Sequence, residues 1–398
     1  MKKTGNNQFL KQYNETMILD LVRINKIISR AELSNITGLS ATATGMTITS
    51  LIEKGYIHET GIGESKGGRR PMMLELKSEA YYSLGFDIDV DCINMTLIDS
   101  TGKIISNDEF KYNETISFEN AVEIIENMIE KAILQFSIKT ERLLGMGFAV
   151  PGMVSSSTQQ IVLAPNLGWH NVNFAAQLKK FKDVPSFVEN EAMASAICEN
   201  WIGSCQGYND FICINIKSGI GAGIFTGGRL YRGASGSAGE VGHISVDENG
   251  PKCGCGSYGC LETMSSTNAI LSNAKKLVRQ GLPSKLNEYE NLEDIGIDEI
   301  VKAARLGDKV SLDILMESAG YLGIAISNIV NTLNPSKIVL GKEFVKYGDL
   351  VLEHIKDIVR SKALKMPASN VEIVISDIGE QVSTLGAAIK PLKALFGK

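Results

Sequence analysis

The residues of this chain that are best suited to chemistry lie between positions 240 and 262. Three thiols and one imidazole, separated by glycines, fall within 18 residues: His243, Cys253, Cys255 and Cys260. This ligand set binds zinc tetrahedrally in structural sites, so we predict a structural Zn2+ here. An odd set of cysteines cannot pair completely as disulfides. The alternative is a turn that is rich in cysteine by chance.

Two carboxylates, Glu240 and Glu262, flank these four ligands. Neither is needed to complete a four-ligand shell. They could bind a polar ligand, or they could support the metal ligands from outside through hydrogen bonds. Both roles could coexist.

The charge of the chain is divided unevenly. Residues 1–77 hold 11 Lys/Arg against 7 Asp/Glu, a net charge of +4, whereas the whole chain carries −5. The remaining residues are therefore acidic. A basic head on an acidic body predicts that the head alone contacts nucleic acid.

The head has the pattern of a helix–turn–helix. Residues 16–24 place apolar side chains at helical spacing. Ser29 and Glu32 form a capping-box pattern for a second helix, and Gly38 suits the turn that follows. A third helix extends to about Lys54. The side chains expected to face inward are Met17, Ile18, Leu21, Val22, Leu33, Ile36, Ile48, Leu51 and Ile52.

The start of the third helix and a basic wing are the predicted DNA contacts. The wing strands are residues 56–60 and 72–76, and the loop between them is rich in glycine and arginine. Gly45 should lie where a side chain would collide with DNA or with the second helix. The alternatives are an ordinary helical hairpin and a solvated basic linker. The predicted contacts are Ser40, Ala41, Thr42, Gly45, Met46, Lys66, Arg69 and Arg70.

Composition indicates a cytoplasmic protein of more than one domain. We expect no apolar run near the ~18 residues needed to cross a bilayer, and no signal peptide precedes the polar start. Cysteines without an export signal imply a reducing compartment. Four of them are expected to be core residues: Cys92, Cys198, Cys205 and Cys213.

From residue 78 strands and helices alternate, which predicts an α/β body of two related halves facing a cleft. The expected domains are the head at 1–77, a first lobe at 78–190 with the helix 380–398 packing back on it, and a second lobe at 191–379 with the cysteine loop and a dimer surface. The expected strands are 82–98 (a hairpin), 144–150, 185–189, 211–216, 219–224, 337–340 and 371–375. The expected helices are 118–135, 191–201, 297–305, 310–333 and one from 383.

Five motifs in this order resemble the ROK family of repressors and sugar kinases. They are ISRAEL at 28–33 with TGLS at 37–40, GGRRP at 67–71, VENEA at 188–192, GEVGH at 239–243, and the cysteine loop. VENEA and the string YRGASG at 231–236 are most similar to the xylose repressors of Gram-positive bacteria. The resemblance covers essentially the whole chain. It implies a winged helix-turn-helix followed by a two-lobed actin-like fold.

The resemblance also implies roles for individual residues. The cysteines and His243 would hold zinc, and the other ring nitrogen of His243 would face a sugar hydroxyl. Carboxylates suit a polyol because they accept its hydroxyl protons in charge-assisted hydrogen bonds. The implied sugar contacts are Asn166, Asn190, Glu191, Glu240, His243 and Glu262.

The motifs argue against a kinase of this family. Family kinases carry a glycine-rich Asp-x-Gly-Gly-Thr phosphate loop, whereas this chain has Asp87, Asp89 and Asp91 in the equivalent run DIDVD. Like charges about 4 Å apart repel by ~4 kcal/mol at an effective dielectric of 20. A second phosphate turn is altered to KSGIG at 217–221, and Glu191 replaces the catalytic aspartate.

We therefore expect a sugar-responsive repressor rather than an enzyme. A homodimer would place two heads on a roughly palindromic operator. A monosaccharide, xylose first and glucose next, would bind between the lobes, and lobe closure would change the spacing of the heads through the linker at 77–82. The alternatives are an ATP-dependent sugar kinase and a DNA-binding scaffold that has lost sugar binding.

Overall fold

The computed structural model describes residues 7–62, 71–113 and 115–397, and it divides into two compact units. The first unit comprises Met1–Glu189 and Ala387–Lys398, and the second comprises Asn190–Gly386. The sequence placed these divisions after residues 190 and 379. Because the head shares the first unit with the first lobe, its boundary at residue 77 stays a prediction.

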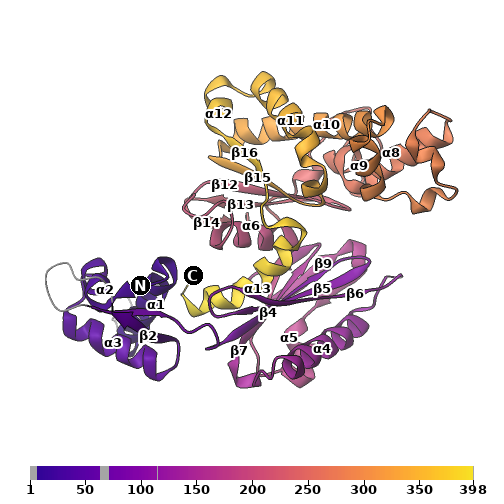
Figure 1. The fold of residues 1–398 in the computed structure, drawn as a ribbon. Coiled ribbons are helices and arrows are strands. Elements are labelled where there is room, and N and C mark those ends of the chain that lie inside the picture. The colour runs from indigo at the N-terminus through magenta and orange to yellow at the C-terminus, as the bar shows by residue number, and fades with distance from the viewer. Residues whose placement is uncertain (1–6, 63–70, 114, 398) are drawn as a thin grey trace. The chain divides into compact units, whose positions relative to one another are not determined.

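The described part of the head, residues 7–62 and 71–77, contains three helices and a small antiparallel sheet (Figure 1). The helices are α1 (Asn7–Asn25), α2 (Arg30–Thr37) and α3 (Ala41–Glu53). The strands are β1 (Ile28–Ser29), β2 (Ile57–Ile62) and β3 (Met72–Leu76), in the order β1-β3-β2. The predicted helix–turn–helix and two-stranded wing are confirmed. The two-residue β1 was not predicted, because its apolar pattern is too short to read.

Most of the side chains that were predicted to face inward are buried, and Met17, Leu21 and Ile52 are half-buried. Ile18, Val22, Leu33, Ile48 and Leu51 are all buried. Ile36, which was expected to face inward, is 57% exposed, so that expectation is wrong. α2 has only two turns, and Ile36 in its last turn lines an open hollow of about 550 Å3 beside α1.

Local hydrogen bonds define the ends of α2. The Oγ of Ser29 accepts from the Glu32 N–H at 3.2 Å, and the Glu32 carboxylate accepts from the Ser29 N–H at 2.9 Å. Gly38 ends the helix with φ +70°, a conformation in which a side chain would be strained. Both predictions for this turn are confirmed.

Replacing Ser29 with alanine is expected to destabilise the head by about 1 kcal/mol, because the first turn of α2 loses its cap. Hydrogen exchange of the α2 amides in the full chain measures the effect. Thr49→Ala is the matched control, since Thr49 is exposed on α3 and its replacement should leave α2 exchange unchanged. Equal exchange in both variants would contradict the capping role.

The first lobe is built on a five-stranded sheet in the order β11-β7-β4-β5-β6. These strands are β4 (Tyr82–Ile88), β5 (Cys92–Asp99), β6 (Ile104–Lys111), β7 (Leu143–Val150) and β11 (Ser186–Asn190). A small sheet adds β8 (Met153–Ser155), β9 (Gln160–Ala164) and β10 (Trp169–Val172), and the helices are α4 (Phe118–Gln135), α5 (Phe174–Gln177) and α13 (Val382–Leu395). The hairpin, α4 and β7 were predicted. β6 was missed because this edge strand is polar and largely exposed.

The second unit repeats the same pattern in the order β14-β13-β12-β15-β16. Its strands are β12 (Phe211–Ile216), β13 (Ile220–Thr226), β14 (Arg229–Tyr231), β15 (Lys337–Lys342) and β16 (Glu372–Ile375). Its helices are α6 (Glu191–Trp201), α7 (Leu261–Ser265), α8 (Thr267–Arg279), α9 (Ile297–Arg305), α10 (Lys309–Leu333), α11 (Gly348–Lys362) and α12 (Lys365–Asn370).

The two sheets correspond strand by strand. β4 pairs antiparallel with β5 and parallel with β7, and β12 pairs antiparallel with β13 and parallel with β15. The prediction of two related α/β halves is confirmed. Each half buries its own core, which is the arrangement expected when helices cover a sheet.

Helix α10 is an exception to the expectation that no apolar segment approaches the length needed to cross a bilayer. Among the described residues it is long and apolar enough to cross a membrane by length and composition, with a mean hydropathy of 1.3 over 18 residues. More than half of that window is buried inside the protein, as in the core helix of a soluble protein.

The four cysteines predicted to be core residues are all buried, as expected.

Candidate functional site

The four predicted metal ligands converge in the second unit. The ligand atoms of His243, Cys253, Cys255 and Cys260 all lie within 4.8 Å of one another. The Cys255 and Cys260 sulfurs are 3.7 Å apart, far longer than the about 2 Å of a disulfide. Metal–sulfur bonds of about 2.3 Å give a tetrahedral edge near this length. The cluster therefore has the donors and the spacing to hold a metal ion, as the sequence predicted.

Backbone contacts help to position the four ligands. His243 ends a single turn, η4 (Val241–His243), and Cys260 precedes α7. The Cys253 N–H donates to the Ser257 carbonyl at 2.8 Å, which closes the loop between the thiols. Gly259 has φ +59°, and a Cβ there would collide with the carbonyl of Asp247. Glycine at this position lets the two sides of the loop touch.

One ring nitrogen of His243 faces the cluster. Its Nδ1 lies 3.6 Å from the Cys253 sulfur, so Nδ1 is the metal-facing nitrogen and Nε2 is directed elsewhere. The ring is exposed at the protein surface. This orientation is compatible with the expectation that the second nitrogen contacts a ligand.

The thiols differ in acidity. A backbone N–H of Ser257 lowers the pKa of the Cys255 thiol, whereas burial and the neighbouring thiols raise the pKa of Cys260. Three thiolates this close together repel one another. A bound dication supplies the charge that lets all three ionise, which is why metal affinity at such sites depends on pH.

Strand β13 gathers the predicted polar residues of the second unit. Its glycines allow close approach: a Cβ at Gly223 would collide with the Ala192 carbonyl of α6, and a Cβ at Gly242 would collide with the Ile220 carbonyl. The Ala222 N–H donates to the Gly239 carbonyl at 2.8 Å. β13 thus holds both the start of α6 and the segment 239–243, which includes η4.

Glu240 lies near both His243 and Glu262. The Glu262 carboxylate accepts from the Ile220 N–H at 3.2 Å, so part of its hydrogen-bonding capacity fixes the metal loop to β13. Glu240 is exposed, yet protein atoms surround its carboxyl group closely enough to raise its pKa by desolvation. The charge of Glu262 raises that pKa further, and His243 opposes the shift. His243 and Glu262 therefore both act electrostatically on Glu240.

Asn190 and Glu191 begin helix α6. The Asn190 Oδ1 caps the helix by accepting from the Ala192 N–H at 2.9 Å and the Met193 N–H at 3.3 Å. A sugar contact by Asn190 would thus use its amide nitrogen. Glu191 is half-buried. Asn166, in contrast, is exposed in the first unit, in the turn η2 (Pro165–Leu167), so its predicted contact stays a prediction.

In the loop after β4, which corresponds to the phosphate loop of the family's kinases, a side chain of the loop bonds to the loop's own backbone. Asp87 and Asp89 are buried at the end of β4. The Asp89 carboxylate accepts from the Val90 N–H at 2.7 Å, and the Tyr112 hydroxyl donates to the Asp89 carbonyl. A phosphate would need that N–H and would meet a negative charge there. The loop is therefore closed to a polyanion.

The predicted DNA-facing residues of α3 lie on its outer surface. Ser40 caps the helix by accepting from the Ala43 N–H at 3.2 Å, and Ala41, Thr42 and Met46 are exposed. Gly45 has no protein atom within 4 Å of an added Cβ. A Cβ at this position would therefore not collide with the second helix. Lys66, Arg69 and Arg70 lie outside the described residues, so their contacts stay predictions.

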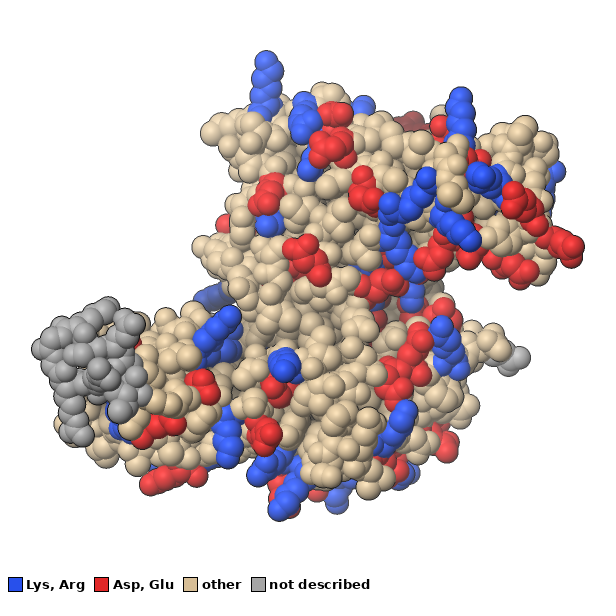
Figure 2. Space-filling model, viewed as in Figure 1, with Lys and Arg blue, Asp and Glu red and all other residues tan. Residues whose placement is uncertain are grey.

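The face of the second unit drawn in Figure 2 has no broad field of one charge among the described residues. Basic and acidic side chains alternate over it. Oppositely charged side chains of this unit also pair with each other, as Arg305 does with Asp349 at 2.8 Å. Such a mixed surface gives DNA little to bind on this face.

Comparison with known proteins agrees with these motifs. Residues 83–392 match the ROK family. The xylose repressor of Caldicellulosiruptor bescii is 33% identical over 382 residues, which cover 96% of each chain. The structure of a ROK family transcriptional regulator, a homologue of the Escherichia coli MLC protein, matches with a TM-score of 0.84 and 28% identity over 97% of each chain.

A kinase structure matches only part of the chain. The ROK family glucokinase from Streptomyces griseus, solved with glucose and AMPPNP, is 28% identical with a TM-score of 0.67. It covers 77% of this chain and 98% of its own. The head thus has counterparts in the regulators, whereas the match to the kinase leaves out about a quarter of the chain. By its family match and its full-length relatives, this chain belongs to the ROK family.

Proposed function

We propose that this chain is a transcriptional repressor whose affinity for DNA is controlled by a monosaccharide, with xylose as the first candidate. The observation that carries the proposal is the full-length match, head included, to a xylose repressor and to a ROK transcriptional regulator. The exposed start of α3 and the winged sheet suit an operator half-site. The protein is a regulator and not an enzyme.

The sugar is proposed to contact Asn190, Glu191, Glu240, His243 and Glu262 in the second unit, with Asn166 added from the first. Metal-bound thiolates would hold His243 while β13 holds Glu262. We take the metal to be zinc, because three thiolates and one imidazole are its preferred structural ligands. The repressor would act as a homodimer in the cytoplasm, so that two heads meet two half-sites.

Fluorescence anisotropy with the operator region upstream of the gene tests the proposal. Specific binding is expected in the nanomolar range at physiological salt, and xylose should change it by about 5–150-fold. Titration calorimetry with xylose, glucose and mannose ranks the sugars. Indifference of DNA binding to every pentose and hexose would contradict the proposal. Steady ATP consumption with any of these sugars would favour the kinase instead.

Glu240→Gln is expected to weaken xylose binding by about 10–100-fold, because a charge-assisted hydrogen bond contributes about 1.5–3 kcal/mol. Calorimetry measures the sugar affinity, and metal analysis measures the zinc content, which should not change. The matched control is Glu248→Gln, an exposed carboxylate in the same loop. If zinc is lost from the Glu240 variant instead, the carboxylate supports the metal rather than the sugar.

A further inference from the structure

Helix α13 takes part in both compact units. The chain passes from the first unit to the second after Glu189, and it returns after Gly386. The first crossing lies at the end of β11, and the second lies within α13. A helix at a crossing fixes the residues on either side in one rotational register better than a loop does, and here Pro391 removes one of its hydrogen bonds.

The beginning of α13 is fixed to α6 in the second unit. Gly386 lies so close to α6 that an added Cβ would collide with the Ala194 carbonyl. α6 starts with Glu191, one of the proposed sugar contacts. A shift of α6 in response to a ligand must therefore displace the beginning of α13.

The middle of α13 is fixed to the sheet of the first unit. A Cβ at Gly147 on β7 would collide with the Ala387 carbonyl, which receives no helical hydrogen bond because Pro391 lacks an N–H. The Ser83 hydroxyl on β4 donates to the Ala388 carbonyl at 2.6 Å. These contacts leave the helix little room to slide independently of the sheet.

An ion pair joins the two crossings. The ammonium of Lys390 contacts the carboxylate of Glu189, which is 2% exposed. The residue that follows Glu189 is Asn190, another proposed sugar contact. Since a buried carboxylate needs its cation, the end of β11 and helix α13 are expected to move together.

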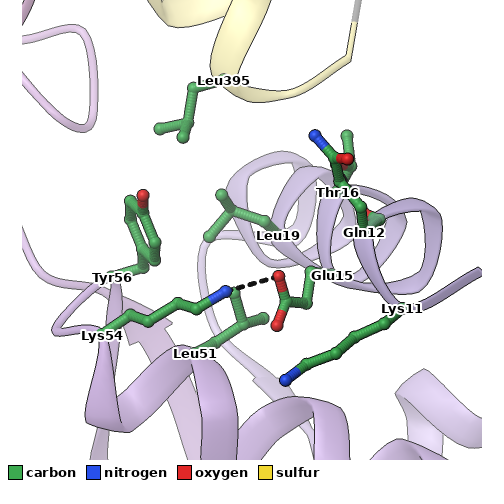
Figure 3. A pocket seen from close by; sticks show the side chains of 9 residues that line it. All are labelled: Lys11, Gln12, Glu15, Thr16, Leu19, Leu51, Lys54, Tyr56 and Leu395. Carbon is green, nitrogen blue, oxygen red and sulfur yellow. Dashed lines mark hydrogen bonds and ion pairs between the residues drawn. The ribbon is translucent and has the colours of Figure 1, made fainter. Parts of the chain in front are cut away.

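The far end of α13 touches the head. The Arg23 guanidinium of α1 lies 5.6 Å from the centre of the Phe396 ring, and Gly397 lies against Thr16. Figure 3 shows Leu395 facing Leu19 and Tyr56 across a hollow of about 410 Å3. The second hollow, of about 550 Å3, borders Phe396 on the other side. Hollows border this contact, so α1 can follow a movement of the end of α13 without unpacking a core.

We propose that Lys390 is the positioning residue that couples sugar binding to the head. It fastens α13 to the strand that ends at the sugar contacts, and the end of α13 then moves α1. This inference rests on the proposed function. Because coupling is a free energy between two ligands, it is measured as the ratio of operator dissociation constants with and without sugar.

The test is Lys390→Met in the full chain. Three quantities are measured: the dissociation constant for xylose, and those for operator DNA without and with saturating xylose. We expect the wild-type ratio to be about 10-fold or more and the variant ratio to fall below about 3-fold. Xylose affinity should stay within about 3-fold, and Lys390→Arg should restore the ratio. The matched control is Arg305→Gln, which breaks the exposed ion pair with Asp349 and should keep the wild-type ratio.

A second variant keeps the test decisive if Lys390→Met does not fold. Phe396→Ala removes the head contact at the other end of α13, and it should lower the ratio in the same way. A wild-type ratio in the folded variants would overturn the coupling role. A wild-type protein that binds operator but ignores every sugar would instead refute the proposed function, and the coupling with it.

Discussion

Replacing Cys255 with serine is expected to release the metal and to abolish measurable sugar binding. Serine does not ionise at neutral pH, so the cluster keeps only three ligands. Cys255 is exposed, and the substitution therefore removes a ligand with little loss of packing. Structural zinc sites contribute apparent binding free energies of about 10–16 kcal/mol in small peptides, so the loop between His243 and Cys260 should lose its order.

Elemental analysis of the purified protein measures the first effect. We expect about one zinc per chain in the wild type and less than about one tenth in the variant. Sugar affinity should fall by about 100-fold or more, because the order that holds Glu240, His243 and Glu262 together is lost. A chelator should reproduce the loss in the wild type. Cys205→Ala is the matched control, since this buried thiol lies outside the cluster. Full zinc content in the Cys255 variant would refute the ligand set.

The cysteine loop that would lose zinc in this experiment is also the part of the candidate site that the sequence predicted best. The metal ligands lie within one loop, and their identity and spacing alone predicted the cluster that the structure shows. The capping box at Ser29 and the positive φ at Gly38 are likewise set by a few neighbouring residues. Interactions of this kind depend on local chain geometry, which is why a single sequence reveals them.

The interactions that organise the site over long distances were not predictable. Lys390 and Glu189 are 201 residues apart, and no local pattern announces that they meet. The strand at 219–224 was predicted, yet the close approach of α6 and η4 to the glycines of β13 depends on the folded sheet. The exposure of Ile36 follows from how α1 and α2 pack, which helical periodicity alone does not fix.

The loss of kinase chemistry and the gain of DNA binding involve separate parts of the chain. The loop at Asp89 satisfies its own N–H groups and carries negative charge, so it excludes a nucleotide without disturbing β4. The proposed sugar contacts lie mainly in the second unit and do not need that loop. A sugar-binding fold can thus become a sensor once phosphate binding is lost and a head is attached to the first unit.

Replacing Gly45 with leucine is expected to abolish specific DNA binding while the head stays folded. No protein atom lies within 4 Å of an added Cβ, and the position has no left-handed φ that would strain a side chain. Glycine inside a helix costs about 1 kcal/mol against a good helix former, so leucine should stabilise α3 slightly. The chain therefore gains nothing in folding from this glycine. We therefore expect this glycine to serve DNA binding, because a longer side chain would collide with the bases in the groove.

Operator affinity is expected to fall by about 10^3-fold. This is the lower end of the usual ratio between specific and non-specific DNA affinity. Anisotropy titration measures it, and thermal unfolding shows that the head is at least as stable as before. Thr49→Leu places the same side chain one turn later on α3, farther from the helix N-terminus that meets base edges, and it should cost much less affinity. If the Gly45 variant bound the operator with wild-type affinity, the first two turns of α3 would not lie in the DNA groove.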